Sequence, residues 1–219
     1  MSVAQFDYGT WSQEIRRRLK SVNPRPRAVF AVSCAEQLAP TYLTFAREAR
    51  WGSPDVLRGA LDIVWQYGSG DGVRDDRIVR DDRIHEVGHR LENAAPELER
   101  FRPLLTLTAI KAVAATYDAL LACGDADPKH AFRAADHCRE AVSRYLSQVS
   151  DLTEDEIHAD TFMRKELDRQ QSLLTDLAQS DLSAPMVNRV RSTVGEEWAK
   201  DLAARILSIT ESTAIKLSE

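Results

Sequence analysis

Apolar residues recur every three or four positions along most of the chain, which is the spacing of one face of a helix. The longest such stripe lies near the C-terminus and consists of Val187, Val190, Val194, Trp198, Leu202, Ile206 and Ile209. No alternating run of β-branched residues stands between turn signals, so the sequence predicts no strand. We therefore predict an all-α, single-domain helical bundle of roughly eight helices over residues 1–219, with no significant sheet. Residues 11–182 would form the main bundle, and residues 185–217 an amphipathic helix packed on it.

Start and stop signals divide this pattern into elements. Pro40 interrupts an apolar stretch, and because proline cannot donate to the helix ladder we expect a kink or a restart there. Thr153 and Glu156 have the spacing of a capping box and predict the start of a long helix toward Leu182. Residues about 68–83 are rich in glycine and charge and include the unit VRDDRI twice. They predict a flexible charged loop.

Composition and charge narrow the classes of partner and compartment. A net charge of −5 gives no general attraction to nucleic acid or to an anionic membrane, so neither is a predicted partner. The most apolar window, residues 104–124, is interrupted by Lys111 and Asp118 and predicts a buried central helix rather than a membrane span. The start of the chain lacks the pattern of a signal peptide. Cys34, Cys123 and Cys138 have no CxxC spacing and fit reduced thiols, so we predict a cytoplasmic protein.

The segment HEVGH, residues 85–89, has the spacing of a helical zinc site. His85 and His89 would lie one turn apart as ligands, and Glu86 would activate a water molecule. Three observations oppose this hypothesis. Arg90 places a cation beside the ion, no sheet is predicted for substrate docking, and the histidines flank an apolar stripe formed by Ile84, Val87, Leu91, Ala94 and Leu98. We predict an exposed polar face without a metal or cofactor, and keep zinc as the alternative.

Residues 30–67, FAVSCAEQLAPTYLTFAREARWGSPDVLRGALDIVWQY, carry a resemblance to a known family. The residues that carry it are Glu36, Pro40, Tyr42, Phe45, Gly52, Leu61, Asp62 and Trp65, and further similarity lies at residues 94–120 and at ELDRQ, residues 166–170. On these residues the chain resembles the YjaG-like family (DUF416), small bacterial proteins of unknown function. The resemblance implies an all-helical fold and brings no activity.

The chain also departs from that family pattern. Lys111 stands where the family tends to have an acidic residue, and Leu167 stands where it usually has an aromatic one. The HEVGH pentad and the doubled VRDDRI unit fall in a connecting region that does not match the pattern.

Six residues are candidates for a binding site: Glu36, Tyr42, Asp62, Trp65, Glu166 and Asp168. A group of carboxylates inside a helical bundle can bind a cation or serve acid–base chemistry. The alternative interpretation is structural. Glu36 and Asp62 would bond backbone or arginine partners at helix crossings, and Tyr42 would give its hydroxyl to one of these carboxylates.

An acidic, motif-poor helical chain with a charged loop suits recognition better than chemistry. Our first hypothesis is therefore a protein that binds another protein, such as a regulatory partner or an immunity protein that neutralises a toxin, and not an enzyme. The alternatives are a metal-dependent hydrolase that uses the pentad and a helical bundle that binds a small molecule. The pattern leaves homo-oligomer formation open.

Overall fold

The computed structural model describes residues 8–70, 81–98, 101, 103–125, 127–150, 152–179 and 181–216. In these ranges the chain is helical and contains no strand, so the predicted all-α class is confirmed. The helices are α1 (Tyr8–Ser21), α2 (Pro24–Ala49), α3 (Pro54–Ser69), α4 (Asp81–Ala94), α5 (Pro103–Gly124), α6 (Lys129–Val149), α7 (Glu154–Ala159), α8 (Thr161–Gln179), α9 (Ala184–Thr193), a π-helical turn (Val194–Trp198) and α10 (Ala199–Lys216).

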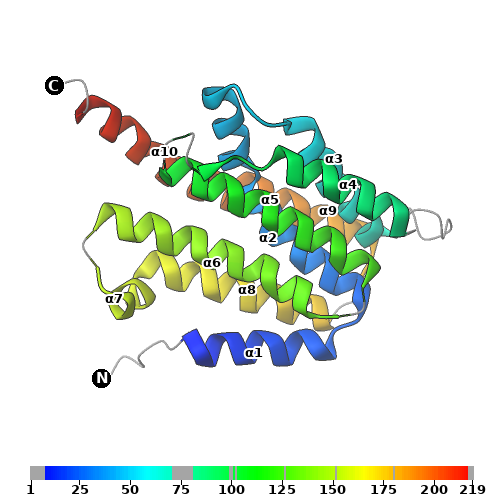
Figure 1. Ribbon diagram of the computed structural model, residues 1–219. Helices are drawn as coiled ribbons and strands as arrows, with labels where there is room; N and C mark the ends of the chain where they lie inside the picture. Colours follow the sequence, from blue (N-terminus) through cyan, green and yellow to red (C-terminus); the bar gives the residue numbers. More distant parts are fainter. Residues whose placement is uncertain are drawn as a thin grey trace, which may run out of the picture.

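Helices α2 and α5 form the centre of the bundle, and the other helices surround them (Figure 1). Almost every residue of α2 from Arg27 to Ala46 is buried, because apolar side chains occupy all of its faces. In α5 the window Leu105–Gly124 is long and apolar enough to cross a membrane, but 67% of it is buried inside the bundle. This burial is that of a core helix, as predicted, and agrees with a soluble protein.

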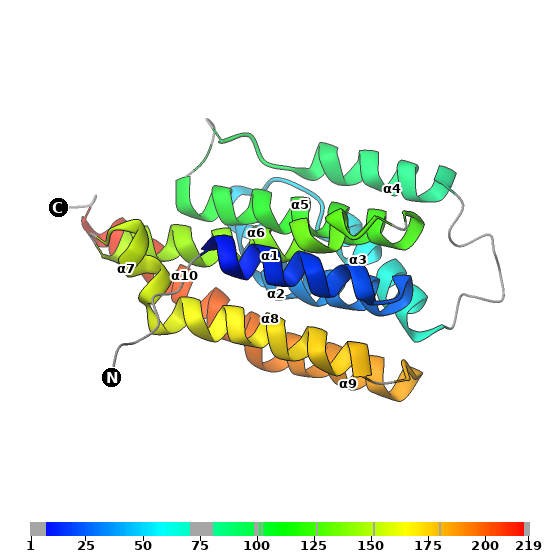
Figure 2. The ribbon, with the colours of Figure 1, turned by 90° about the horizontal axis from the view of Figure 1, so that it is seen from below.

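The outer helices lie on two opposite sides of the central layer. Figure 2 shows α4 on one side of the central layer, and α8 with α9 on the opposite side. Helix α9 runs along α8 there, and α10 continues from the π-helical turn (Figure 2). The helix that carries the HEVGH pentad, α4, therefore lies on the opposite side of the central layer from α8 and α9 (Figure 2).

One predicted helix boundary is wrong, and one of two predicted alternatives is excluded. Helix α2 continues through Pro40, so of the predicted kink or restart the restart does not occur, because burial of the helix offsets the loss of one backbone hydrogen bond. The long helix expected from Thr153 to Leu182 is divided at Asp160, which has an extended backbone and ends α7. Its carboxylate accepts a hydrogen bond from Phe162 N at 2.7 Å and so caps the start of α8. The capping box of Thr153 is present as predicted.

The loop and the C-terminal helix also need correction. Helix α3 extends to Ser69 and α4 begins at Asp81, so only the middle of the predicted loop lies between them, and residues 71–80 lie outside the described residues. The predicted C-terminal helix is interrupted by the π-helical turn, in which Ala199 N donates to Val194 O five residues earlier. Val187, Val194, Leu202 and Ile206 of the predicted stripe are buried.

Candidate functional site

Three of the predicted site residues meet where α2, α3 and α9 cross. The carboxylate of Glu36 accepts hydrogen bonds from Arg58 Nη1 at 2.5 Å, Arg58 Nη2 at 2.6 Å and Trp65 Nε1 at 2.9 Å. Asp62 pairs with Arg191 and lies 3.3 Å from Arg58 Nε. Burial alone would raise the pKa of Glu36, but the bonds from Arg58 and Trp65 hold it below the usual value. Both oxygens of Glu36 are thus engaged within the protein, which agrees with the structural interpretation.

Tyr42 does not join this cluster. Its hydroxyl donates to Ala94 O and accepts from Ser53 N, both at 2.9 Å, so it ties α2 to the end of α4 and the start of α3. The expectation that Tyr42 bonds Glu36 or Asp62 is wrong, because two backbone groups occupy its oxygen. Gly52 has φ +89°, and a Cβ there would lie 2.5 Å from the hydroxyl oxygen of Tyr42.

The pentad HEVGH packs through its glycine. Gly88 is buried, and a Cβ at this position would lie 2.7 Å from the ring of Tyr117 on α5. The close approach of α4 to α5 leaves His85 and His89 in solvent, and the side chain of His89 is 78% exposed. His89 Nδ1 lies 3.2 Å from Glu92 Oε2, an exposed contact one turn away.

Glu86 lines a groove between α3 and α4 of about 410 Å³, together with Asp55 and Arg90. Among the described residues no three His, Cys, Asp or Glu side chains are arranged to hold a metal ion. No third ligand therefore joins His85 and His89 among these residues.

Glu166, on α8, lies in a second buried cluster. Its side chain is 2% exposed and accepts from Gln37 Nε2 at 2.7 Å and from Gln170 Nε2 at 2.6 Å. The third partner is Arg169, whose Nη2 pairs with the same carboxylate. The guanidinium of Arg169 also stacks on Trp198 of the π-helical turn, at 4.3 Å from the ring centroid. This cluster joins α2, α8 and the π-helical turn in the interior.

Arg169 forms the floor of a groove between α8 and α9, here called the α8–α9 groove. The groove has a volume of about 420 Å³ and is lined by Asp168, Arg169, Ser172, Leu173, Asp176, Met186, Arg189, Val190, Thr193 and Trp198. The side chain of Arg169 is 10% exposed, and its Nε has no hydrogen-bond acceptor among the described residues. Asp168, the sixth predicted candidate, is exposed at the rim. A buried cation thus borders a half-open apolar groove.

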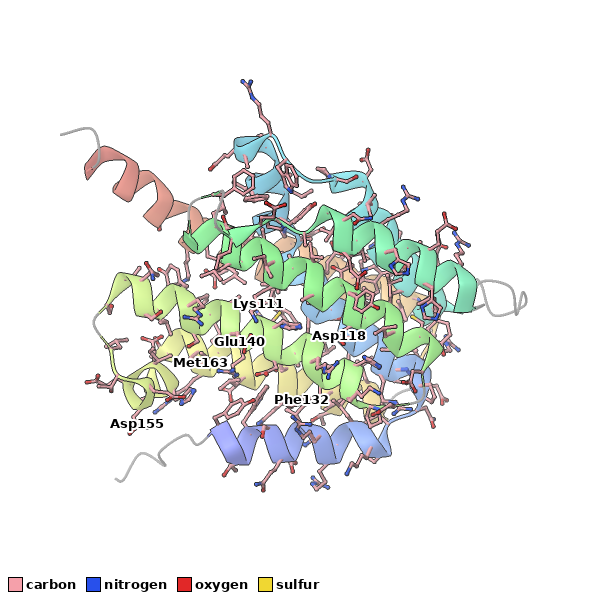
Figure 3. All side chains as sticks on the ribbon, viewed as in Figure 1. Lys111, Asp118, Phe132, Glu140, Asp155 and Met163 are labelled. Atoms are coloured by element: carbon pink, nitrogen blue, oxygen red, sulfur yellow. The ribbon has the colours of Figure 1, made fainter. Side chains whose placement is uncertain are left out.

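The predictions missed a polar network between α5 and α6. Asp118 Oδ1 lies 3.0 Å from His130 Nδ1, and Asp118 Oδ2 lies 3.3 Å from His137 Nε2. Figure 3 shows Lys111 of α5 beside Glu140 of α6, with Asp118 further along α5, and Lys111 and Glu140 form an ion pair. The sequence did contain a signal for this network. Lys111 and Asp118 are seven residues apart, as are His130 and His137, so each pair lies on one face of its helix and the two faces can meet.

Burial would lower the pKa of His137, but the carboxylates of Asp118 and Glu140 raise it above the usual value. His137 Nδ1 lies 3.9 Å from Glu140 Oε2, so this second contact is electrostatic rather than a hydrogen bond. His137 lowers the pKa of Glu140 to about 2, with a further contribution from Lys111. Asp118 and Glu140 each pair with a basic side chain, which indicates a structural network, although His137 Nδ1 and Glu140 Oε2 have no hydrogen-bond partner among the described residues.

The fold and these clusters define an all-helical bundle with internal ion pairs and an open groove on one side. The model of a protein family of unknown function, DUF416, matches residues 14–199. The chain therefore belongs to the DUF416 family, as the resemblance implied. It is similar to the crystal structure of a DUF416 family protein from Shewanella baltica OS155, with 25% identity and a TM-score of 0.71 over 82% of this chain and 92% of that one. None of the curated proteins matches this chain.

Proposed function

We propose that this protein binds a small organic molecule in the α8–α9 groove. The observation that carries the proposal is the groove itself, which apolar side chains line and the nearly buried cation Arg169 borders. The volume of about 420 Å³ lies within the range of small-molecule sites.

The composition of the α8–α9 groove supports the same function. Leu173, Met186 and Val190 line it with apolar atoms, and a few polar groups converge on them, as in typical ligand pockets. The π-helical turn that places Trp198 at its wall is a feature often found at functional sites. The Glu36 cluster offers less support, because its carboxylate is already bonded by Arg58 and Trp65.

A thermal-shift screen of metabolites tests the proposal. A ligand at a hundred times its dissociation constant adds about 2.7 kcal/mol, which raises the Tm of a chain of this length by about 5–10 °C. Val190→Trp would fill the α8–α9 groove and should abolish the shift. Ile63→Trp is the matched control, because it fills the α3–α4 groove instead. A shift that Ile63→Trp removes and Val190→Trp leaves unchanged would assign the ligand to the other groove.

The protein-partner and zinc hypotheses stay predictions with tests of their own. Affinity capture with the full chain tests the first, and an adjacent gene for a secreted toxin would favour the immunity version. Metal analysis of the purified protein tests the second. Zinc near one equivalent that is lost in His89→Ala would support the hydrolase, whereas a folded protein without metal would remove it.

A further inference from the structure

We propose that the ligand of the α8–α9 groove is a small zwitterion with an apolar body, such as an α-amino acid with an aromatic side chain, whose ammonium group pairs with Asp176 and whose carboxylate pairs with Arg189. This inference rests on the proposed function and adds the chemical class of the ligand. It is carried by two opposite charges on the two walls of one apolar groove.

Asp176 and Arg189 stand at nearly the same level of the groove. Asp176 lies three residues before Gln179, where α8 ends, and Arg189 lies five residues after Ala184, where α9 begins. Helix α9 runs back along α8 (Figure 2), so at about 1.5 Å per residue the two positions differ by about 3 Å along the groove. The acidic side chain on α8 and the basic side chain on α9 therefore lie across the groove from each other.

Neither of these two charges is paired within the part of the chain that the structure describes. Both side chains are exposed, and although both line the same groove they form no ion pair with each other. A ligand that carries both charges can bridge the two walls, with its ammonium group at Asp176 and its carboxylate at the guanidinium fork of Arg189. A ligand with a single charge would leave one wall without a partner.

The remaining charged groups of the groove do not cancel this arrangement. Arg169 is paired with Glu166, and its Nε and Nη2 atoms are buried, so this pair presents little net charge to a ligand. Asp168 lies on the same wall as Asp176, two turns away along α8. Its carboxylate opposes an anionic group at the far end of the ligand, so the body of the ligand should not be acidic.

Apolar side chains line the groove beside the two charges. Leu173 lies within one turn of Asp176 on α8, and Val190 follows Arg189 on α9. Further along the groove is Trp198, whose ring also stacks on the buried guanidinium behind it. An aromatic side chain that extends from the charged end toward the indole would lie along these residues, and its burial supplies the hydrophobic part of the binding free energy.

NMR titration of the isotope-labelled full chain tests the class and locates the site. The probes are phenylalanine, 2-phenylethylamine, which lacks the carboxylate, and 3-phenylpropanoate, which lacks the ammonium group. Because water screens exposed ion pairs, each pair contributes modestly, and phenylalanine should bind about two- to fivefold more tightly than either singly charged probe. The amide signals that shift should belong to α8 and α9.

Variants assign each charge preference to one side chain. Asp176→Asn should make phenylalanine and 3-phenylpropanoate bind equally, while phenylalanine keeps its advantage over 2-phenylethylamine. Arg189→Gln should have the reverse effect. The matched controls are Asp181→Asn, in the segment between α8 and α9, and Arg164→Gln, on α8. Both lie outside the groove and should keep both ratios. The two substituted side chains of the groove are exposed, so these variants should fold.

Each result has a defined meaning. Equal binding of the three probes overturns the inference and leaves the proposed function standing. The same holds if a singly charged probe binds more tightly than phenylalanine, or if Asp181→Asn changes the ratios as much as Asp176→Asn does. It also holds if no probe shifts signals of α8 and α9 while the screen finds another ligand that Val190→Trp displaces. If no compound in the screen binds at the α8–α9 groove, the proposed function fails as well.

Discussion

Glu166→Gln should destabilise the protein by about 2–4 kcal/mol. The side chain of Glu166 is 2% exposed and that of Arg169 is 10% exposed, so the substitution leaves a buried cation without its counter-charge. Removal of one partner of a fully buried ion pair costs about 3–5 kcal/mol. The expected value is lower here, because Arg169 keeps its contact with Trp198 and borders a groove that water enters.

The assay is equilibrium unfolding in urea, followed by circular dichroism. Glu14→Gln is the matched control, because Glu14 also pairs with arginines, Arg17 and Arg18, but in a more exposed position, with 29% of its side chain exposed. It should change the unfolding free energy little. Glu166→Gln combined with Arg169→Met should recover part of the loss, since no unpaired buried charge remains. A loss for Glu166→Gln no larger than that for Glu14→Gln would refute the reasoning.

Two further predictions concern a glycine turn and a histidine. Gly52→Ala should destabilise the protein by about 2–4 kcal/mol in the same assay, since it adds a methyl group 2.5 Å from the Tyr42 hydroxyl oxygen at a residue with φ +89°. Gly59→Ala is the control, because it adds a methyl group in open space inside α3, and it should stabilise the protein by about 0.5–1 kcal/mol. Equal effects of the two substitutions would contradict this prediction. Because Asp118 and a second carboxylate raise the pKa of His137, its contribution to stability is complete below its unfolded pKa of about 6.5 and is lost as the pH rises through the higher folded value. Stability should therefore fall as the pH rises above about 6.5, and Asp118→Asn should flatten this fall; an unchanged slope would exclude the mechanism.

Helical periodicity was sufficient to predict the class of fold, and local signals were less reliable for boundaries. The capping box at Thr153 was correct because its two hydrogen bonds lie within four consecutive residues. The restart that Pro40 allowed does not occur, because packing around α2 outweighs one missing hydrogen bond, and packing partners are distant in sequence. The end of α7 depends on Asp160, whose role as a cap is visible only once the extended backbone at that residue is known.

The contacts of the candidate site residues also differ in whether the sequence alone could predict them. Asp62 and Trp65 lie on one helix at a spacing that allows both to face Glu36, so that cluster was within reach of sequence reasoning. The pairing of Arg169 with Trp198 was not, because the two residues lie on different helices and the π-helical turn shifts the register of the second. The donor without an acceptor, Arg169 Nε, is a property of the packed interior alone.

Two of the departures of this chain from the family pattern, Lys111 and Leu167, leave the α8–α9 groove intact. Lys111 pairs with Glu140 on α6, so a cation on the central helix has a partner. Leu167 is buried, and it does not line the groove, although its neighbour Arg169 does. The segment ELDRQ, which carries part of the resemblance, supplies both halves of the buried ion pair at the groove floor. On our proposal, a search for the activity of this protein should therefore begin at this floor rather than at the exposed pentad, whose glycine already accounts for its close packing on α5.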